Sequence, residues 1–200
     1  MAISLEELLK NYKLIPSAAN KASLKFAVEQ TDYPCIMLKM GDINTLRKYT
    51  TYIHEYGKTV MVHIDSIKGI AKDKAGFHYM KRIGVDAIIS MKPQYIKMIR
   101  EEDIHAILGV FLVDSASVSY AVQNIHFTKP DSVIVMPMTI PDETFEYLQK
   151  SVNVPILAGG LGIHERIISH VLSLGITACP VTNQELLKKY MEEGDCDEKS

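Results

Sequence analysis

Eight short apolar runs recur along this chain, and a longer amphipathic stretch follows each of them. The runs are rich in Val, Ile, Leu and Ala, and most show no alternation of apolar and polar residues. A strand with one face in water alternates, so continuous apolar runs indicate strands buried on both faces, as in a parallel sheet covered by helices. We predict strands at residues 14–17, 35–39, 59–65, 86–90, 105–114, 132–137, 155–160 and 177–181.

The stretches between the runs carry apolar residues at helical spacing. In residues 163–174, for example, Ile163, Ile167, Val171 and Leu174 fall on one face of a helix. Residues that favour helix ends agree with this pattern: Asp73, Asp142 and Asn183 are predicted N-caps, and Gly57, Gly84 and Gly175 follow helix ends. The predicted helices are 23–30, 44–56, 71–83, 92–102, 115–125, 142–151, 163–174 and 183–193.

Strict alternation of eight strands with eight helices predicts an α/β fold, a single small (β/α)8 barrel of the TIM type. We assign residues 1–190 to the barrel and expect residues 191–200, which are acidic and polar, to form a disordered tail. A doubly wound open sheet is the alternative. That fold usually has fewer strands and a glycine-rich first turn, whereas the first turn here reads IPSAAN.

Composition narrows the class of protein. The net charge of -2 and the presence of only four arginines do not indicate a strongly basic nucleic-acid binder. The three cysteines form no CxxC pair, and their odd number does not suggest a disulfide framework. The sequence has neither a signal-peptide pattern at its start nor an apolar stretch long enough to span a membrane. We therefore expect a cytoplasmic protein without a membrane partner.

In a barrel of this type the carboxyl ends of all strands meet at one mouth, where ligands bind. Polar and glycine residues follow several of the predicted strands, although the strands themselves are apolar. We therefore expect a ligand site at the mouth. The candidate residues are Lys39, His63, Asp65, Lys92, Asp114, Ser115, Gly159, Gly160, Thr182 and Asn183.

Two features at the last two strands together indicate a phosphate site. Gly159 and Gly160 would let backbone N–H groups approach an anion closely. Thr182 and Asn183 open the final helix, whose free N–H groups and dipole also favour an anion. The structural alternative is a tight turn followed by an ordinary helix cap.

The other strand-end side chains allow several interpretations. His63, Asp65 and Asp114 are suited to acid–base work, but they are too few to predict a metal, and we expect neither a metal nor a cofactor. They could equally be hydrogen-bonded polar groups of the barrel rim. Lys92 could pair with an anionic ligand, form a Schiff base or lie in solvent. Cys35 and Cys179 are predicted core residues.

Six short motifs resemble one known family in their order and spacing. The chain is similar to the glycerol uptake operon antiterminator regulatory proteins from about Ile15 to Leu187. The resemblance implies a small (β/α)8 barrel that binds glycerol 3-phosphate and then contacts a leader mRNA, preventing early termination of transcription. The motifs are VHID (62–65), IISMK (88–92), FLVDS (111–115), KPD (129–131), PILAGG (155–160) and VTN (181–183).

The same resemblance implies a phosphate site at Gly159, Gly160, Thr182 and Asn183, with Asp65, Lys92, Asp114 and Ser115 on the rim beside it. The chain also departs from the family pattern, mostly by having apolar residues where polar ones are usual. The departures are Leu108-Gly109 for Gln-Arg, Ile134 for Glu, Pro137-Met138 for Pro-Gly, Pro180-Val181 for Ser-Thr, and Lys68 for Glu.

Three functions remain open from the sequence. The first is a non-enzymatic regulator that binds glycerol 3-phosphate and leader mRNA, and a homodimer could assemble enough positive surface for the RNA. The second is an isomerase, aldolase or lyase that acts on a small phosphorylated metabolite. The third is a degenerate family member that keeps the barrel as an interaction module.

Overall fold

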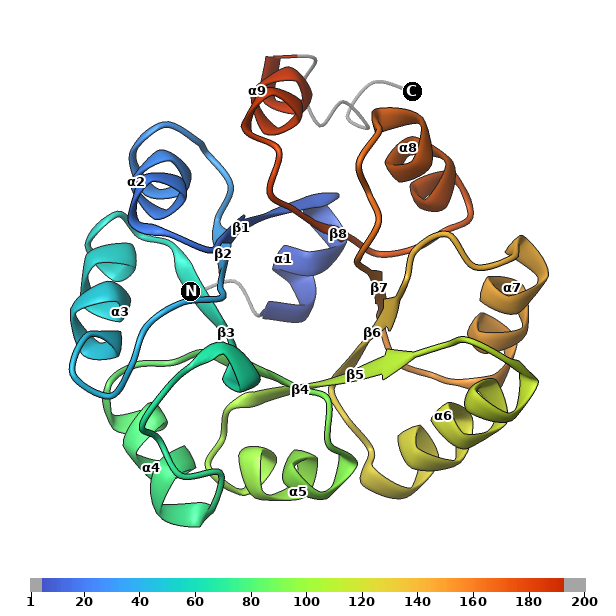
Figure 1. Ribbon diagram of the computed structural model, residues 1–200, viewed down its shortest axis with the longest axis horizontal. Helices are drawn as coiled ribbons and strands as arrows, with labels where there is room; N and C mark the ends of the chain where they lie inside the picture. The colour runs from blue at the N-terminus through green and yellow to red at the C-terminus, as the bar shows by residue number, and fades with distance from the viewer. Residues whose placement is uncertain (1–4, 193–200) are drawn as a thin grey trace.

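Each predicted apolar run contains a strand in the computed structural model, which describes residues 5–192 (Figure 1). Pairing between neighbouring strands is parallel throughout, in the order β7-β6-β5-β4-β3-β2-β1-β8. The two end strands meet through a bridge between Leu157 and Ala178, which makes a nearly closed barrel and excludes the open sheet. The strands are β1 (Leu14–Ala18), β2 (Cys35–Leu38), β3 (Thr59–His63), β4 (Ala87–Ser90), β5 (His105–Phe111), β6 (Ser132–Met136), β7 (Ile156–Ala158) and β8 (Cys179–Val181).

All eight predicted helices form, and they surround the strands (Figure 1). No helix within residues 5–192 is long and apolar enough to cross a membrane. The outer helices are α2 (Lys21–Glu29), α3 (Leu46–Glu55), α4 (Lys74–Arg82), α5 (Pro93–Glu101), α6 (Ser115–Thr128), α7 (Asp142–Ser151), α8 (Glu165–Ser173) and α9 (Gln184–Glu192).

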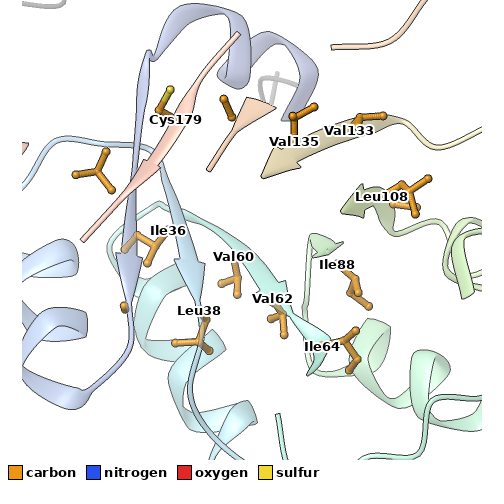
Figure 2. Close-up of a cluster of buried hydrophobic side chains, with 14 of the residues drawn as sticks. Ile36, Leu38, Val60, Val62, Ile64, Ile88, Leu108, Val133, Val135 and Cys179 are labelled. Atoms are coloured by element: carbon orange, nitrogen blue, oxygen red, sulfur yellow. The ribbon is translucent and has the colours of Figure 1, made fainter. Parts of the chain in front are cut away.

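The strand side chains divide between two cores because neighbouring residues of a strand point to opposite faces. In β2, Cys35 and Met37 belong to the cluster inside the barrel, whereas Ile36 and Leu38 pack outward under the helices. Figure 2 shows residues of this outer cluster on neighbouring strands, among them Ile36 and Leu38. Burial of both faces explains why the strands carry no apolar–polar alternation. Cys179, like Cys35, is a buried free thiol, as predicted for both.

The sequence analysis missed one helix, α1 (Leu5–Asn11), which precedes the first strand. Its Leu9 is 1% exposed and packs with Ile15, Met61 and other residues of the inner cluster. The helix therefore closes the amino-terminal end of the barrel, and Figure 1 shows it within the ring of strands. Leu5, Leu8 and Leu9 lie at helical spacing, which is the signal in the sequence for this helix.

Several predicted boundaries were wrong by a few residues. β3 ends at His63, and Ile64–Ser66 forms a short 3-10 turn in place of the last strand residues. β5 ends at Phe111 because Asp114 begins α6 as its N-cap. Pro141 is the N-cap of α7, so Asp142 is the first helical residue and not the cap.

Other helix ends also differ from the prediction: α4 begins at Lys74, α6 continues to Thr128, and α8 begins at Glu165, so Ile163 lies outside it. The predicted cap Asp73 and the predicted glycines after helices agree with the structure. The Asp73 side chain accepts from the Gly76 N–H at the start of α4, and the glycines after α3, α4 and α8 have positive φ. Residues 191 and 192 of the expected tail belong to α9, and residues 193–200 lie outside the described residues.

The packing of α1 predicts that Leu9→Ala destabilises the barrel by about 2–5 kcal/mol, because the substitution leaves a cavity in the inner core. Val113→Ala is the control, since Val113 is 82% exposed and its truncation should cost no more than about 0.5 kcal/mol. Urea unfolding measures both changes. An equally small effect for the two variants would mean that α1 does not support the barrel.

Candidate functional site

The carboxyl ends of the strands surround a small cavity of about 210 Å³ at the barrel mouth. Its polar lining comes from Ser17, Lys39, His63 and Thr182 together with the glycine-rich turn 159–163. Apolar residues form the rest of the lining: Met37, Ile89, Ile134 and Met136 of the inner cluster, together with Pro180 and Val181 of β8. A small cavity of this kind, apolar with a few polar groups, is typical of a ligand site.

The turn after β7 has the backbone shape that its glycines allow. Gly160 has a φ of +73°, a conformation that favours glycine. A side chain at Gly159 would begin 3.1 Å from the Ile134 Cδ1 atom, and one at Gly162 would begin 2.8 Å from the Met138 sulfur. Glycines thus let the turn lie directly against β6 and the loop that follows it.

Unused backbone donors are present at this turn. The N–H groups of Gly160, Gly162 and Thr182 make no backbone hydrogen bond to any residue in the range 5–192. The Gly159 N–H, in contrast, donates to the Val135 carbonyl at 2.9 Å and so belongs to the sheet. Free N–H groups in a concave turn are suited to hold an anion.

Two ionisable side chains line the cavity within the described residues, Lys39 and His63. Burial lowers the pKa of His63, and the positive charges of Lys39 and Lys72 lower it further, while the Asp65 carboxylate acts in the opposite direction. The imidazole is therefore neutral at pH 7. The Nδ1 atom of His63 lies 3.3 Å from the Ser66 hydroxyl, which leaves the other ring nitrogen for a ligand.

Some predicted site residues have structural roles at helix starts. The Asp114 carboxylate accepts from the Ser117 N–H at 2.7 Å and caps α6, and its hydrogen bonds to Ser117 lower its pKa. Asn183 caps α9 by accepting from the N–H groups of Glu185 at 3.0 Å and Leu186 at 3.2 Å. Neither residue lines the cavity. Asp114 and Ser115 instead line a separate groove between α6 and α7.

Asp65 and Lys92 lie at strand ends but also outside the cavity lining. The Asp65 carboxylate pairs with the Lys72 ammonium and accepts from the Met91 N–H at 3.4 Å. Burial opposes ionisation of Asp65, yet these contacts lower its pKa. The Lys92 ammonium lies 5.8 Å from the centre of the Tyr95 ring. Within residues 5–192 no cluster of three or more His, Cys, Asp or Glu side chains could hold a metal.

The sequence analysis did not predict Ser17 or Leu161–Ile163 as part of this cavity. Ser17 follows Ile15 by two residues, so the period of the strand alone could have placed it on the inner face. The turn residues carry no side-chain signal, because their contribution is the backbone. Two departures from the family pattern, Ile134 and Pro180, line the cavity.

Comparison with known proteins identifies the family. A sequence model of the glycerol-3-phosphate responsive antiterminator family matches residues 14–187. The chain belongs to this family.

A solved structure from Listeria monocytogenes, a glycerol uptake operon antiterminator regulatory protein, is 25% identical to this chain. It has a TM-score of 0.81, and the match covers 88% of this chain and 95% of that one. A glycerol uptake operon antiterminator-related protein from Thermotoga maritima is 23% identical, with a TM-score of 0.79 over 88% of this chain and 98% of that chain, which shows the fold.

The uncharacterized protein YgcP of Escherichia coli K12 is 26% identical over 180 residues, which is 90% of this chain and 93% of that protein. Barrel enzymes are also similar in structure. An N-acetylmannosamine-6-phosphate 2-epimerase from Clostridium perfringens, for example, has a TM-score of 0.64 at 11% identity over 95% of this chain and 96% of that chain, which shows the fold alone.

The cavity electrostatics predict that Lys39→Met raises the pKa of His63, because the substitution removes a nearby positive charge. NMR titration of the His63 ring protons measures this pKa. Lys150→Met, far from the mouth on α7, is the control and should leave the His63 titration unchanged. A His63 pKa that stays constant in Lys39→Met would place the two side chains too far apart to interact.

Proposed function

We propose that this protein is a transcription antitermination regulator that binds glycerol 3-phosphate in the mouth cavity and contacts a leader mRNA. Membership of the glycerol-3-phosphate responsive antiterminator family supports the class of function. The observation that carries the choice of site is the glycine turn with unused N–H donors, which lines the same cavity as Lys39. A regulator of nascent transcripts acts where transcription takes place, and we propose the cytoplasm as that compartment.

The phosphate binds, in this proposal, to the turn at Gly160 and Gly162, and Lys39 supplies the opposite charge. The glycerol hydroxyls face Ser17, His63 and Thr182, each of which can donate or accept a hydrogen bond. Asn183 contributes indirectly, because its cap fixes the start of α9 beside Thr182. The apolar lining at Ile134 and Pro180 leaves few polar side chains for a larger or more highly charged ligand.

The phosphate site predicts that Gly160→Asp weakens binding of glycerol 3-phosphate at least tenfold, about 1.4 kcal/mol, in isothermal titration calorimetry. The new carboxylate repels the phosphate where N–H groups should face it. Gly57→Asp is the matched control: Gly57 also has a positive φ of +70°, but it follows α3 at the opposite end of the barrel and has no neighbour to clash with. Gly57→Asp should bind as the unaltered protein does.

The remaining outcomes separate the alternative functions. Tight binding retained in Gly160→Asp would place the ligand elsewhere on the chain. Failure of the unaltered protein to bind would support a degenerate family member that serves as an interaction module. If the protein consumes glycerol 3-phosphate or a related phosphorylated metabolite, it is a barrel enzyme and the regulator proposal is wrong.

The regulatory proposal also predicts that glycerol 3-phosphate strengthens binding to the leader transcript of the glycerol genes. Each lysine or arginine that contacts an RNA phosphate releases a counterion, so the affinity should fall as salt rises. A gel-shift assay with and without glycerol 3-phosphate, across a range of salt concentrations, measures both effects. Strong binding that ignores both the ligand and salt would contradict the proposed switch.

A further inference from the structure

The net charge of -2 conceals a strong division of charge around the barrel mouth. We compare the segments that run from the end of each strand to the fifth residue of the next helix. After β1 to β4, these segments hold ten Lys and Arg residues and three Asp residues. After β5 to β8, they hold two Lys and Arg residues and six Asp and Glu residues. One half of the mouth, from α2 to α5 in Figure 1, is therefore strongly positive.

A groove of about 680 Å³ between α2 and α3 opens within this positive half. Lys21 lies at the start of α2, and Arg47 and Lys48 lie in the first turn of α3, all three lining the groove. None of the three forms an ion pair with another residue of the range 5–192. Glu55 also lines the groove, so the lining carries three cationic side chains and one carboxylate, and its balance favours an anionic partner.

Aromatic rings lie beside these cations. Tyr49 and Tyr52 line the groove, and the Tyr52 hydroxyl donates to the Glu29 carboxylate at 2.7 Å, which fixes the ring. Tyr56 follows α3 at the end away from the mouth, just beyond the residues that line the groove. It packs edge-on against Tyr52 with ring centres 5.6 Å apart, and it is 50% exposed. The unpaired cations of the groove and the exposed Tyr56 ring beyond its end supply the two features that bind single-stranded nucleic acid, namely phosphate attraction and base stacking.

We propose that the α2–α3 groove, with the positive half of the mouth beside it, is the surface that binds single-stranded RNA. This inference rests on the proposed function for the identity of the partner. Arg47, Lys48 and Lys21 contact RNA phosphates, and Tyr56 stacks on an unpaired base. Lys39 belongs both to this positive half and to the lining of the ligand cavity, so the two sites are adjacent. A single protomer thus has a positive surface large enough to contact RNA, although the net charge of the chain is negative.

The test uses the full-length protein and a fluorescein-labelled, 20-nucleotide single-stranded RNA of mixed sequence, followed by fluorescence anisotropy. The double variant Arg47→Gln with Lys48→Gln should weaken binding at least tenfold. It should also reduce the slope of log affinity against log salt by about 1.4, because each phosphate contact to a single strand contributes about 0.7. Lys81→Gln with Lys150→Gln removes the same charge from exposed sites away from the groove and should change binding little.

Tyrosine variants test the stacking contact separately from charge. Tyr56→Ala should weaken binding roughly fivefold or more, and Tyr56→Phe should retain it, because a phenyl ring still stacks on a base. Circular dichroism of each variant shows whether the barrel is intact. Equal losses for Tyr56→Phe and Tyr56→Ala in folded protein would overturn the stacking role.

The outcomes distinguish failure of this surface assignment from failure of the proposed function. If the unaltered protein binds RNA and the groove variant binds equally well, the RNA surface lies elsewhere and the regulatory function stands. If the unaltered protein binds neither this RNA nor the leader transcript, the regulatory function fails as well. Binding of a poly-glutamate peptide in preference to the RNA would overturn the nucleic-acid assignment in favour of an acidic protein partner.

Discussion

The structure depends on the parallel pairing of eight strands whose two faces are both buried. The pairing brings all eight carboxyl ends to one end of the barrel, and the period of two along each strand decides which side chains enter the interior. The register sets Ser17 opposite Met37 and His63 opposite Ile89. The inner cluster of apolar side chains lies below the cavity, so the polar groups that line the cavity come from this end of the strands.

Residues at the mouth divide between two tasks. Asp114 and Asn183 accept hydrogen bonds from N–H groups in the first turn of the helices that follow them. Side chains with this capping role point toward their own helix and do not line the cavity. Lys39 directly follows β2 and His63 ends β3; neither side chain caps a helix, and both line the cavity. The division explains why a row of polar strand-end residues in the sequence does not form one polar cluster in space.

Charge around the mouth follows the order of the chain. The lysine-rich loops all follow the first four strands, and neighbouring strands in sequence are neighbours in the barrel. Positive charges that are distant in sequence therefore produce one positive potential over half of the rim. The net charge of the whole chain does not show this local potential. The cavity lies inside this rim, so a small anion and a larger polyanion would meet the same side of the molecule.

The sequence by itself determined the fold class and the eight strand–helix units, because strands buried on both faces consist of continuous apolar runs. It also determined that polar residues gather at the carboxyl ends of the strands. It also carried the family motifs. Only the tertiary structure decided that Ser17 and the N–H groups of residues 160 and 162 join Lys39 and His63, while Asp65, Lys92, Asp114 and Asn183 have other partners. Side-chain direction, helix capping and free backbone donors depend on the local path of the chain, which residue identity does not specify. The same reason holds for α1, because its Leu9 packs against inner-cluster residues from strands that are distant in sequence.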